Sequence, residues 1–167
     1  MALSPRLARR GVRDRLRILV LTGLGAVALV VPVLFVGGLP VTQPESLWLA
    51  LPLVLGVADL VLVPAVGSTV RPLPYGVAEA DARRISGGAL LTVCALRAGL
   101  AEAPAVFGLA ASLISHSVVP YAIGFAFAVP LLAIYAYPRR AVVDGVRERL
   151  ESTGERSRIW EAISGEQ

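Results

Sequence analysis

Four long apolar runs constrain this chain more than any other feature of its sequence. A helix needs about 20 apolar residues to cross the hydrocarbon core of a bilayer, which is roughly 30 Å thick. The runs have this length and lack the alternation of apolar and polar residues that is typical of strands. We therefore predict an all-α integral membrane protein whose transmembrane domain is a four-helix bundle. The predicted spans are about 18–38, 47–66, 89–115 and 118–137.

The composition excludes an ordinary soluble domain. The 167 residues are 56% hydrophobic and 17% charged, with a mean hydropathy of +0.71. Average soluble chains carry about 25% charged residues. A domain of this size leaves roughly 30% of its unfolded surface exposed, so this much apolar surface cannot be hidden in one globule. The lipid bilayer is the expected partner for the remainder.

The arginine residues predict how the chain is oriented. All sixteen basic residues are arginine, and fifteen of them lie in the arm 1–17, the linker 67–88 and the tail 138–167. The loop 39–46 and the turn around His116 contain none. By the positive-inside rule, both termini and the linker lie in the cytoplasm. We expect a multi-pass protein of the cytoplasmic membrane.

The tail has an amphipathic pattern. Val142, Val143, Val146 and Leu150 share one helical face, and charged residues occupy the others. This pattern predicts an amphipathic cytoplasmic helix at the membrane surface. The arginines of the arm and tail would favour anionic lipid headgroups over nucleic acid as a partner. A solvated tail without a partner is an equally good interpretation.

Residues for catalysis or cofactor binding are scarce. Cys94 is the single cysteine and His116 the single histidine, which is too few for a typical zinc site. Ser115 and His116 are neighbours, but an adjacent pair in a turn is not a catalytic arrangement by itself. We expect no catalytic residues, no metal, no cofactor and no enzymatic activity.

Three ionisable residues lie inside the predicted spans, where charge is costly. At about 1.5 Å of rise per residue, Asp59 and Arg97 both lie about 12 Å from the inner boundary. We predict that Asp59 and Arg97 form an ion pair between the second and third helices. The alternative is that Arg97 extends to the cytoplasmic interface.

Glu102 lies about 7.5 Å closer to the outer face than Arg97 and about 140° around the helix from it. If Asp59 pairs with Arg97, Glu102 has no basic partner in the chain. A carboxyl group in this position is expected to be protonated. It either carries a proton or cation, or hydrogen-bonds to a neighbouring helix as a structural group.

Small residues spaced by four recur on the third and fourth predicted helices. Such residues let helices approach closely, inside the bundle or against a partner subunit, and the sequence does not choose between the two. They are Ala95, Gly99, Ala103, Gly108, Ser112, Gly124 and Ala128.

The segment 100–109 reads Leu-Ala-Glu-Ala-Pro-Ala-Val-Phe-Gly-Leu. It resembles the carboxylate-bearing helix of the proteolipid, or c-type, subunits of rotary ATP synthases and ATPases. In that family the glutamate carries the transported proton or sodium ion, and Glu102 occupies the matching position. The resemblance covers about a tenth of the chain. The chain departs from the family in three ways. The partner helix of the family contains a series of alternating glycines, of which only Gly23 and Gly25 have counterparts here, and the polar Arg-Gln-Pro loop is missing. Arg97 lies on the same helix as the glutamate, whereas the family places its essential arginine on the stator.

Two classes of function follow. The first is an accessory, structural or assembly component of a membrane complex, which needs no catalytic site. The alternative is an oligomeric protein that translocates protons or cations and uses Glu102 as the carrier carboxylate. A polar path to Glu102 would favour the second class, and a homo-oligomer is expected if it holds.

Overall fold

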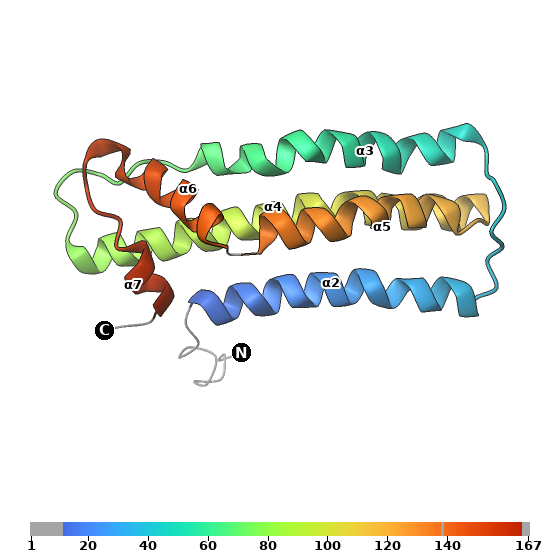
Figure 1. Ribbon diagram of the computed structural model, residues 1–167, viewed down its shortest axis with the longest axis horizontal. Coiled ribbons are helices and arrows are strands. Elements are labelled where there is room, and N and C mark those ends of the chain that lie inside the picture. The colour runs from blue at the N-terminus through green and yellow to red at the C-terminus, as the bar shows by residue number, and fades with distance from the viewer. Residues whose placement is uncertain (1–11, 138, 165–167) are drawn as a thin grey trace, which may run out of the picture.

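The computed structural model describes residues 12–137 and 139–164, and Figure 1 shows their arrangement. Residues 1–11 of the predicted basic arm lie outside the described residues, as do 138 and 165–167. Four long helices lie side by side, and successive helices run in opposite directions. They are α2 (Val12–Val36), α3 (Ser46–Ala65), α4 (Glu79–Ser115) and α5 (Val119–Leu131), which continues as the π-helical segment η2 (Leu132–Ala136).

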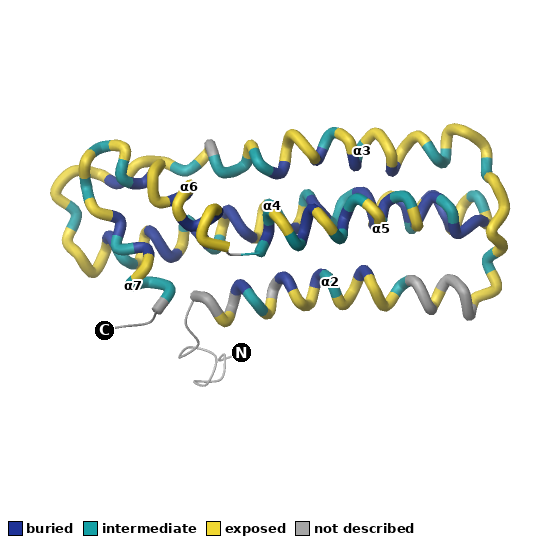
Figure 2. The backbone as a smooth tube through the Cα atoms, viewed as in Figure 1, coloured by how far each residue is buried: buried dark blue, intermediate teal, exposed yellow. Residues whose placement is uncertain are grey.

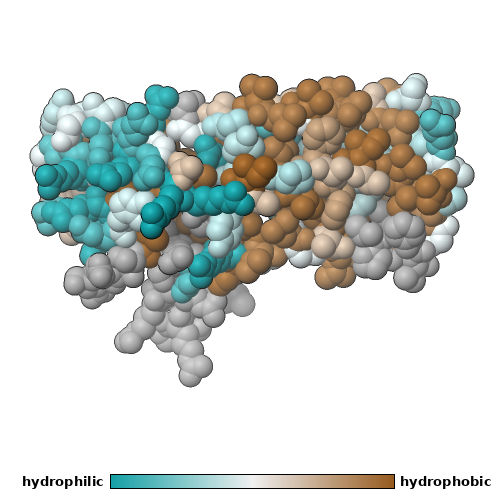
Figure 3. All heavy atoms as spheres, viewed as in Figure 1, coloured by the Kyte–Doolittle hydropathy of each residue, from teal (hydrophilic) through white to brown (hydrophobic). Residues whose placement is uncertain are grey.

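Three of these helices are long and apolar enough to cross a membrane: α3, α4 and α5 with η2. Their outward faces carry apolar side chains, such as Val61 of α3, which is 70% exposed. Figure 2 shows α3 exposed along its outer side, and Figure 3 shows apolar residues covering the middle of the molecule. The prediction of an all-helical fold is confirmed for the described residues, and three of the predicted spans correspond to helices long and apolar enough to cross a membrane. The apolar stretch described for α2, Leu16–Val30, is shorter than a span, so the fourth span stays a prediction.

Helices α4 and α5 pack so closely that their backbones touch. A Cβ atom added to Gly124 of α5 would lie 2.1 Å from the carbonyl oxygen of Pro104 in α4. One added to Gly108 of α4 would lie 2.7 Å from the carbonyl oxygen of Pro120. Ala128, the next small residue on α5, is fully buried. Glycine is therefore required at these two positions because no side chain fits between the backbones.

Polar groups hold the end of the bundle at which α4 turns into α5. The backbone N–H of Tyr121 donates to the Ser112 hydroxyl at 2.9 Å, and the Tyr121 hydroxyl donates to the carbonyl of Val27 on α2. The N–H of Val118 donates to the carbonyl of Pro40 at 3.2 Å, which ties the loop after α2 to this turn. The N–H groups of Val118 and Tyr121 lie at the start of α5, where no helical acceptor is available, and these bonds satisfy them.

Helix α4 is longer than the sequence predicts. The predicted span 89–115 is the second part of one continuous helix of 37 residues, which begins ten residues earlier at Glu79. At 1.5 Å per residue it is about 55 Å long, well beyond the hydrocarbon core. Gly87 and Gly88 cost about 1 kcal/mol each in a helix interior, but buried packing around Gly87 and Leu90 offsets this cost.

The extension of α4 is packed inside a polar cap, formed by residues 66–88 and 139–164. Its remaining elements are η1 (Val66–Thr69), α6 (Arg140–Leu150), η3 (Glu151–Thr153) and α7 (Ile159–Ser164). The start of α2 and the end of η2 lie at the same end of the bundle (Figure 1).

Helix α6 buries its apolar face against protein. Val143, Val146 and Leu150 are at most 2% exposed and share one cluster with Leu73 and Ile159. The sequence analysis placed this face on the membrane surface, whereas the structure places it in the core of the polar cap. The difference arises because α4 extends far enough to supply a protein surface for it. The arginines of α6, in contrast to these valines, are exposed.

A network centred on Glu151 holds the chain between α6 and α7. The carboxylate accepts hydrogen bonds from the backbone N–H and hydroxyl of Ser157, at 3.0 and 2.9 Å, and from Nε of Arg147 at 3.1 Å. Burial alone would raise the pKa of Glu151, but these hydrogen bonds outweigh it, so the pKa lies below its ordinary value of 4.5. The negative charge of Glu151 therefore stabilises the folded cap.

Candidate functional site

Asp59 lies on the inward face of α3, where it is 3% exposed. It shares this face with Pro52, Gly56 and Val63, which are also buried. The Oδ2 atom of Asp59 is buried and accepts no hydrogen bond from any residue that the structure describes. A carboxylate without partners is expensive in such surroundings, so a neutral carboxyl group fits this position better.

Arg97 of α4 extends toward the polar cap. Its Nη2 atom donates a hydrogen bond to the carbonyl oxygen of Pro64 at 3.1 Å. Pro64 lies in the last turn of α3, where carbonyl groups have no helical partner and the helix dipole favours positive charge. Arg97 therefore stabilises the end of α3. Its Nε atom is buried and has no acceptor among the described residues.

Asp59 and Arg97, both of which the structure describes, do not form an ion pair with each other. The group that Arg97 contacts, the Pro64 carbonyl, lies five residues beyond Asp59, or about 7.5 Å along α3. The sequence argument compared the depths of the two backbones and left out the length of the arginine side chain. The arrangement agrees in direction with the alternative, in which Arg97 extends to the interface.

Glu102 of α4 lies against α2. A Cβ atom added to Gly23 of α2 would lie 2.1 Å from Oε1 of Glu102, so the missing side chain of Gly23 makes room for the carboxyl group. Glu102 is half-buried, and no described residue forms an ion pair with it. The sequence analysis did not connect Gly23 with Glu102. The pair Gly23 and Gly25 in the first apolar run was the signal available.

The carboxyl group of Glu102 opens into a groove between α2 and α4, which we call the α2–α4 groove. Its volume is about 560 Å³. Small and apolar residues line it: Ile18, Thr22, Gly23, Ala26, Ala95, Ala98, Gly99 and Glu102. The groove is therefore a narrow surface at which two backbones are accessible and one ionisable group is present.

The structure separates the predicted small residues into two groups. Gly108, Ser112, Gly124 and Ala128 are buried between α4 and α5, within the bundle. Ala95 and Gly99 are exposed and line the α2–α4 groove, while Ala103 is half-buried. The first group is already used for packing inside the chain, and the pair Ala95 and Gly99 is not.

The residues considered for metal binding or catalysis lie apart. His116 is exposed and ends α4 in a left-handed conformation with φ of 50°. Cys94 is buried in the cluster at the polar cap. Within residues 12–137 and 139–164, no three His, Cys, Asp or Glu side chains are grouped so that they could hold a metal ion.

The fold and the α2–α4 groove together define a class: a helical protein with three apolar helices long enough to cross a membrane. No protein-family model matches the chain, and neither the characterised proteins nor the solved structures include a significant match. The function is therefore argued from the geometry of this chain.

Proposed function

We propose that the chain crosses the cytoplasmic membrane four times, with α2 as the first span and the polar cap in the cytoplasm. Helix α2 has 25 residues, or about 37 Å, and lies alongside α4 as the other spans do (Figure 1). Arginines gather at the end of the bundle that carries the polar cap, which the positive-inside rule assigns to the cytoplasm. An odd number of spans would separate the start of α2 from α6 and α7, which lie at one end.

Within that membrane, we propose that the protein is a non-catalytic accessory or assembly component that binds a transmembrane helix of another membrane protein in the α2–α4 groove. One observation carries the proposal: Ala95, Gly99 and Glu102 line an open groove that no other described part of the chain fills. Small residues allow a second helix backbone to approach closely, and van der Waals contact drives helix association in lipid.

Glu102 supports the same proposal by its chemistry. A protonated carboxyl group can donate one hydrogen bond and accept others, and hydrocarbon offers it no partner. A neighbouring helix that presents a hydroxyl, amide or carbonyl group would satisfy it. The groove therefore combines close backbone approach with one polar contact that sets the register of the bound helix.

A photo-crosslinking experiment tests the proposal. A benzophenone amino acid at Thr22, in the groove, is expected to crosslink one defined membrane protein, whereas the same probe at Val57, on the lipid-facing side of α3, is not. Gly99→Leu should remove the crosslink because it fills the groove. A Cβ atom at Gly99 meets nothing within 4 Å, so the variant should fold.

Gly25→Leu is the matched control, because Gly25 is also exposed, also meets nothing within 4 Å, and does not line the groove. The crosslink should survive it. A crosslink that persists in Gly99→Leu, or that forms equally from Val57, would overturn the proposal. A crosslink to a second copy of the chain would also count against it and favour the alternative function.

The alternative is proton or cation translocation by an oligomer, and the accessibility of Glu102 favours it. The carboxyl group opens into the groove and is not sealed inside the bundle, which supports access to it from the surface of the bundle. Infrared difference spectroscopy against Glu102→Gln separates the two functions. A band that titrates reversibly between about pH 6 and 9 would indicate that protons reach the carboxyl group, and a proton-flux assay in liposomes would follow. A band that stays constant leaves Glu102 as a packing group.

A further inference from the structure

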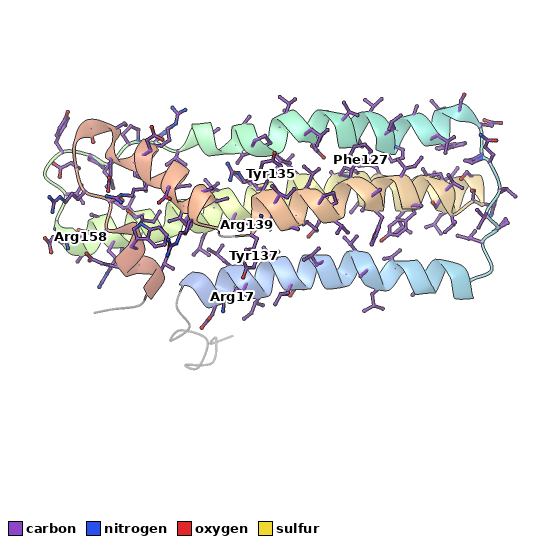
Figure 4. The ribbon with its side chains drawn as sticks, viewed as in Figure 1. Arg17, Phe127, Tyr135, Tyr137, Arg139 and Arg158 are labelled. Atoms are coloured by element: carbon purple, nitrogen blue, oxygen red, sulfur yellow. The ribbon has the colours of Figure 1, made fainter. Side chains whose placement is uncertain are left out.

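A second cavity lies where α3 ends and α6 begins, and we call it the arginine cavity. Its volume is about 510 Å³. It lies between α3, α4, η2 and α6. Its lining residues are Pro64, Gly67, Arg97, Ile134, Tyr135, Arg139, Ala141, Val142, Gly145, Val146, Glu148 and Arg149. Figure 4 labels Tyr135 and Arg139, which lie on either side of the junction between η2 and α6.

Positive charge dominates this cavity. Arg97, Arg139 and Arg149 line it, and Glu148 is the acidic residue among the lining residues. None of the three arginines forms an ion pair with a described residue. The Nε atom of Arg97 is buried and lacks an acceptor, although a buried donor without a partner costs about 1–3 kcal/mol. The cavity therefore has donors and charge that an anion would satisfy.

The backbone also contributes positive electrostatic potential to the arginine cavity. Helix α6 begins at Arg140, and Ala141 in its first turn lines the cavity. The first turn contains no acidic residue, and no side chain caps it. The N–H groups of a helix N-terminus point outward and favour anions, phosphate in particular. The π-helical segment η2 ends beside this terminus and places Tyr135, with its hydroxyl group, in the lining.

The cavity lies at the edge of the apolar surface. Its lining includes Pro64 in the last turn of α3 and Ile134, which is 46% exposed. Leu62, two residues before Pro64 on α3, is also exposed. An acyl chain on this surface would leave its headgroup at the level of the three arginines. Polar and apolar surface meet at this end of the bundle in Figure 3.

We propose that the arginine cavity binds a phosphate group, and that its source is the headgroup of an anionic phospholipid. Arg97 and Arg139 donate to the phosphate oxygens, the start of α6 adds its N–H groups, and the lipid tails lie along α3 and η2. The proposal needs these helices to lie in a membrane but does not depend on the α2–α4 groove or on a partner protein. A site of this kind anchors the polar cap to the inner leaflet at one defined position.

The test uses the full-length protein in detergent, with short-chain phosphatidylglycerol as the probe and phosphatidylcholine as the reference lipid. Saturable binding is measured by native mass spectrometry and by the shift in unfolding temperature. Phosphatidylglycerol is expected to bind at least 10-fold more tightly than phosphatidylcholine. Arg139→Gln is expected to reduce that affinity by about 10-fold, since it removes a charge-assisted hydrogen bond.

Two further variants make the result decisive. Arg97→Gln should weaken binding similarly, but it also removes the contact with Pro64, so Arg139→Gln is the primary variant because Arg139 is exposed. Arg84→Gln is the control: Arg84 is exposed on α4 and lies outside the cavity, so binding should be unchanged.

Competition experiments also distinguish a lipid headgroup from a soluble ligand as the source of the phosphate. Competition by inorganic phosphate or glycerol phosphate at micromolar concentration would support the phosphate site but assign it to a soluble ligand. No competition at millimolar concentration would support the lipid. Equal binding of phosphatidylglycerol by the protein, Arg139→Gln and Arg84→Gln would overturn the proposal.

Discussion

Gly124→Ala is the change whose consequence the structure specifies most closely. The added Cβ atom would lie 2.1 Å from the carbonyl oxygen of Pro104, 2.6 Å from its carbonyl carbon and 2.9 Å from Cα of Ala105. All three are backbone atoms, so no side chain can rotate away. To restore an ordinary contact of 3.4 Å, α4 and α5 must separate by about 1.3 Å. Overpacking of this kind costs about 1–3 kcal/mol.

Gly99→Ala is the matched control, because Gly99 lies on α4 but faces the α2–α4 groove and not α5. Its Cβ atom would meet nothing within 4 Å, so the change is expected to be neutral or slightly stabilising. Both variants are compared with the parent by unfolding in mixed micelles of increasing dodecyl sulfate content, followed by far-ultraviolet circular dichroism. Gly124→Ala should unfold at a lower dodecyl sulfate fraction than both. Equal stability of the two variants would refute the close α4–α5 contact.

Three other predictions follow from named contacts. Tyr121→Phe removes the hydrogen bond to the Val27 carbonyl and should lower the free energy of unfolding by about 1 kcal/mol; an unchanged unfolding temperature would contradict the bond. Gly23→Ala should displace the Glu102 carboxyl group and shift its infrared carbonyl band, which Gly25→Ala should leave in place. Because the folded pKa of Glu151 is lowered, its charge stabilises the cap above about pH 4.5 and this contribution is lost as pH falls below that value. Glu151→Gln should therefore be less stable at neutral pH and should show a smaller loss of stability between pH 5 and pH 3; parallel profiles would exclude this role.

The helices of the bundle could be predicted because lipid imposes one rule on every apolar run: its backbone must be satisfied internally. That rule identifies α3 and α5 within a few residues. It does not apply outside the bilayer, where Glu79 to Gly88 contain charges and two glycines and do not extend the apolar run of the third span. Packing by residues far along the chain, such as Val143 and Ile159, keeps this segment helical.

Side-chain contacts were harder to predict than spans. Depth along a helix gives the level of Asp59 and Arg97 but not the direction in which a long side chain extends, and the guanidinium of Arg97 extends to the carbonyl of Pro64 at the end of α3. Spacing by four marks Gly99 and Gly124 equally, because both satisfy the same pattern. Only the rotation of each helix about its own axis decides that Gly124 of α5 is buried against a backbone and that Gly99 of α4 faces the groove.

Helix α4 also links the two ends of the molecule mechanically. Between Glu79 and Glu102 it contains no proline, so this part behaves as a stiff rod about 35 Å long. Ser86 near one end of the rod contacts the chain at Ser157 in the polar cap, and Glu102 at the other end contacts α2 at Gly23. The cap and the α2–α4 groove are therefore held at a fixed spacing by one uninterrupted helical segment.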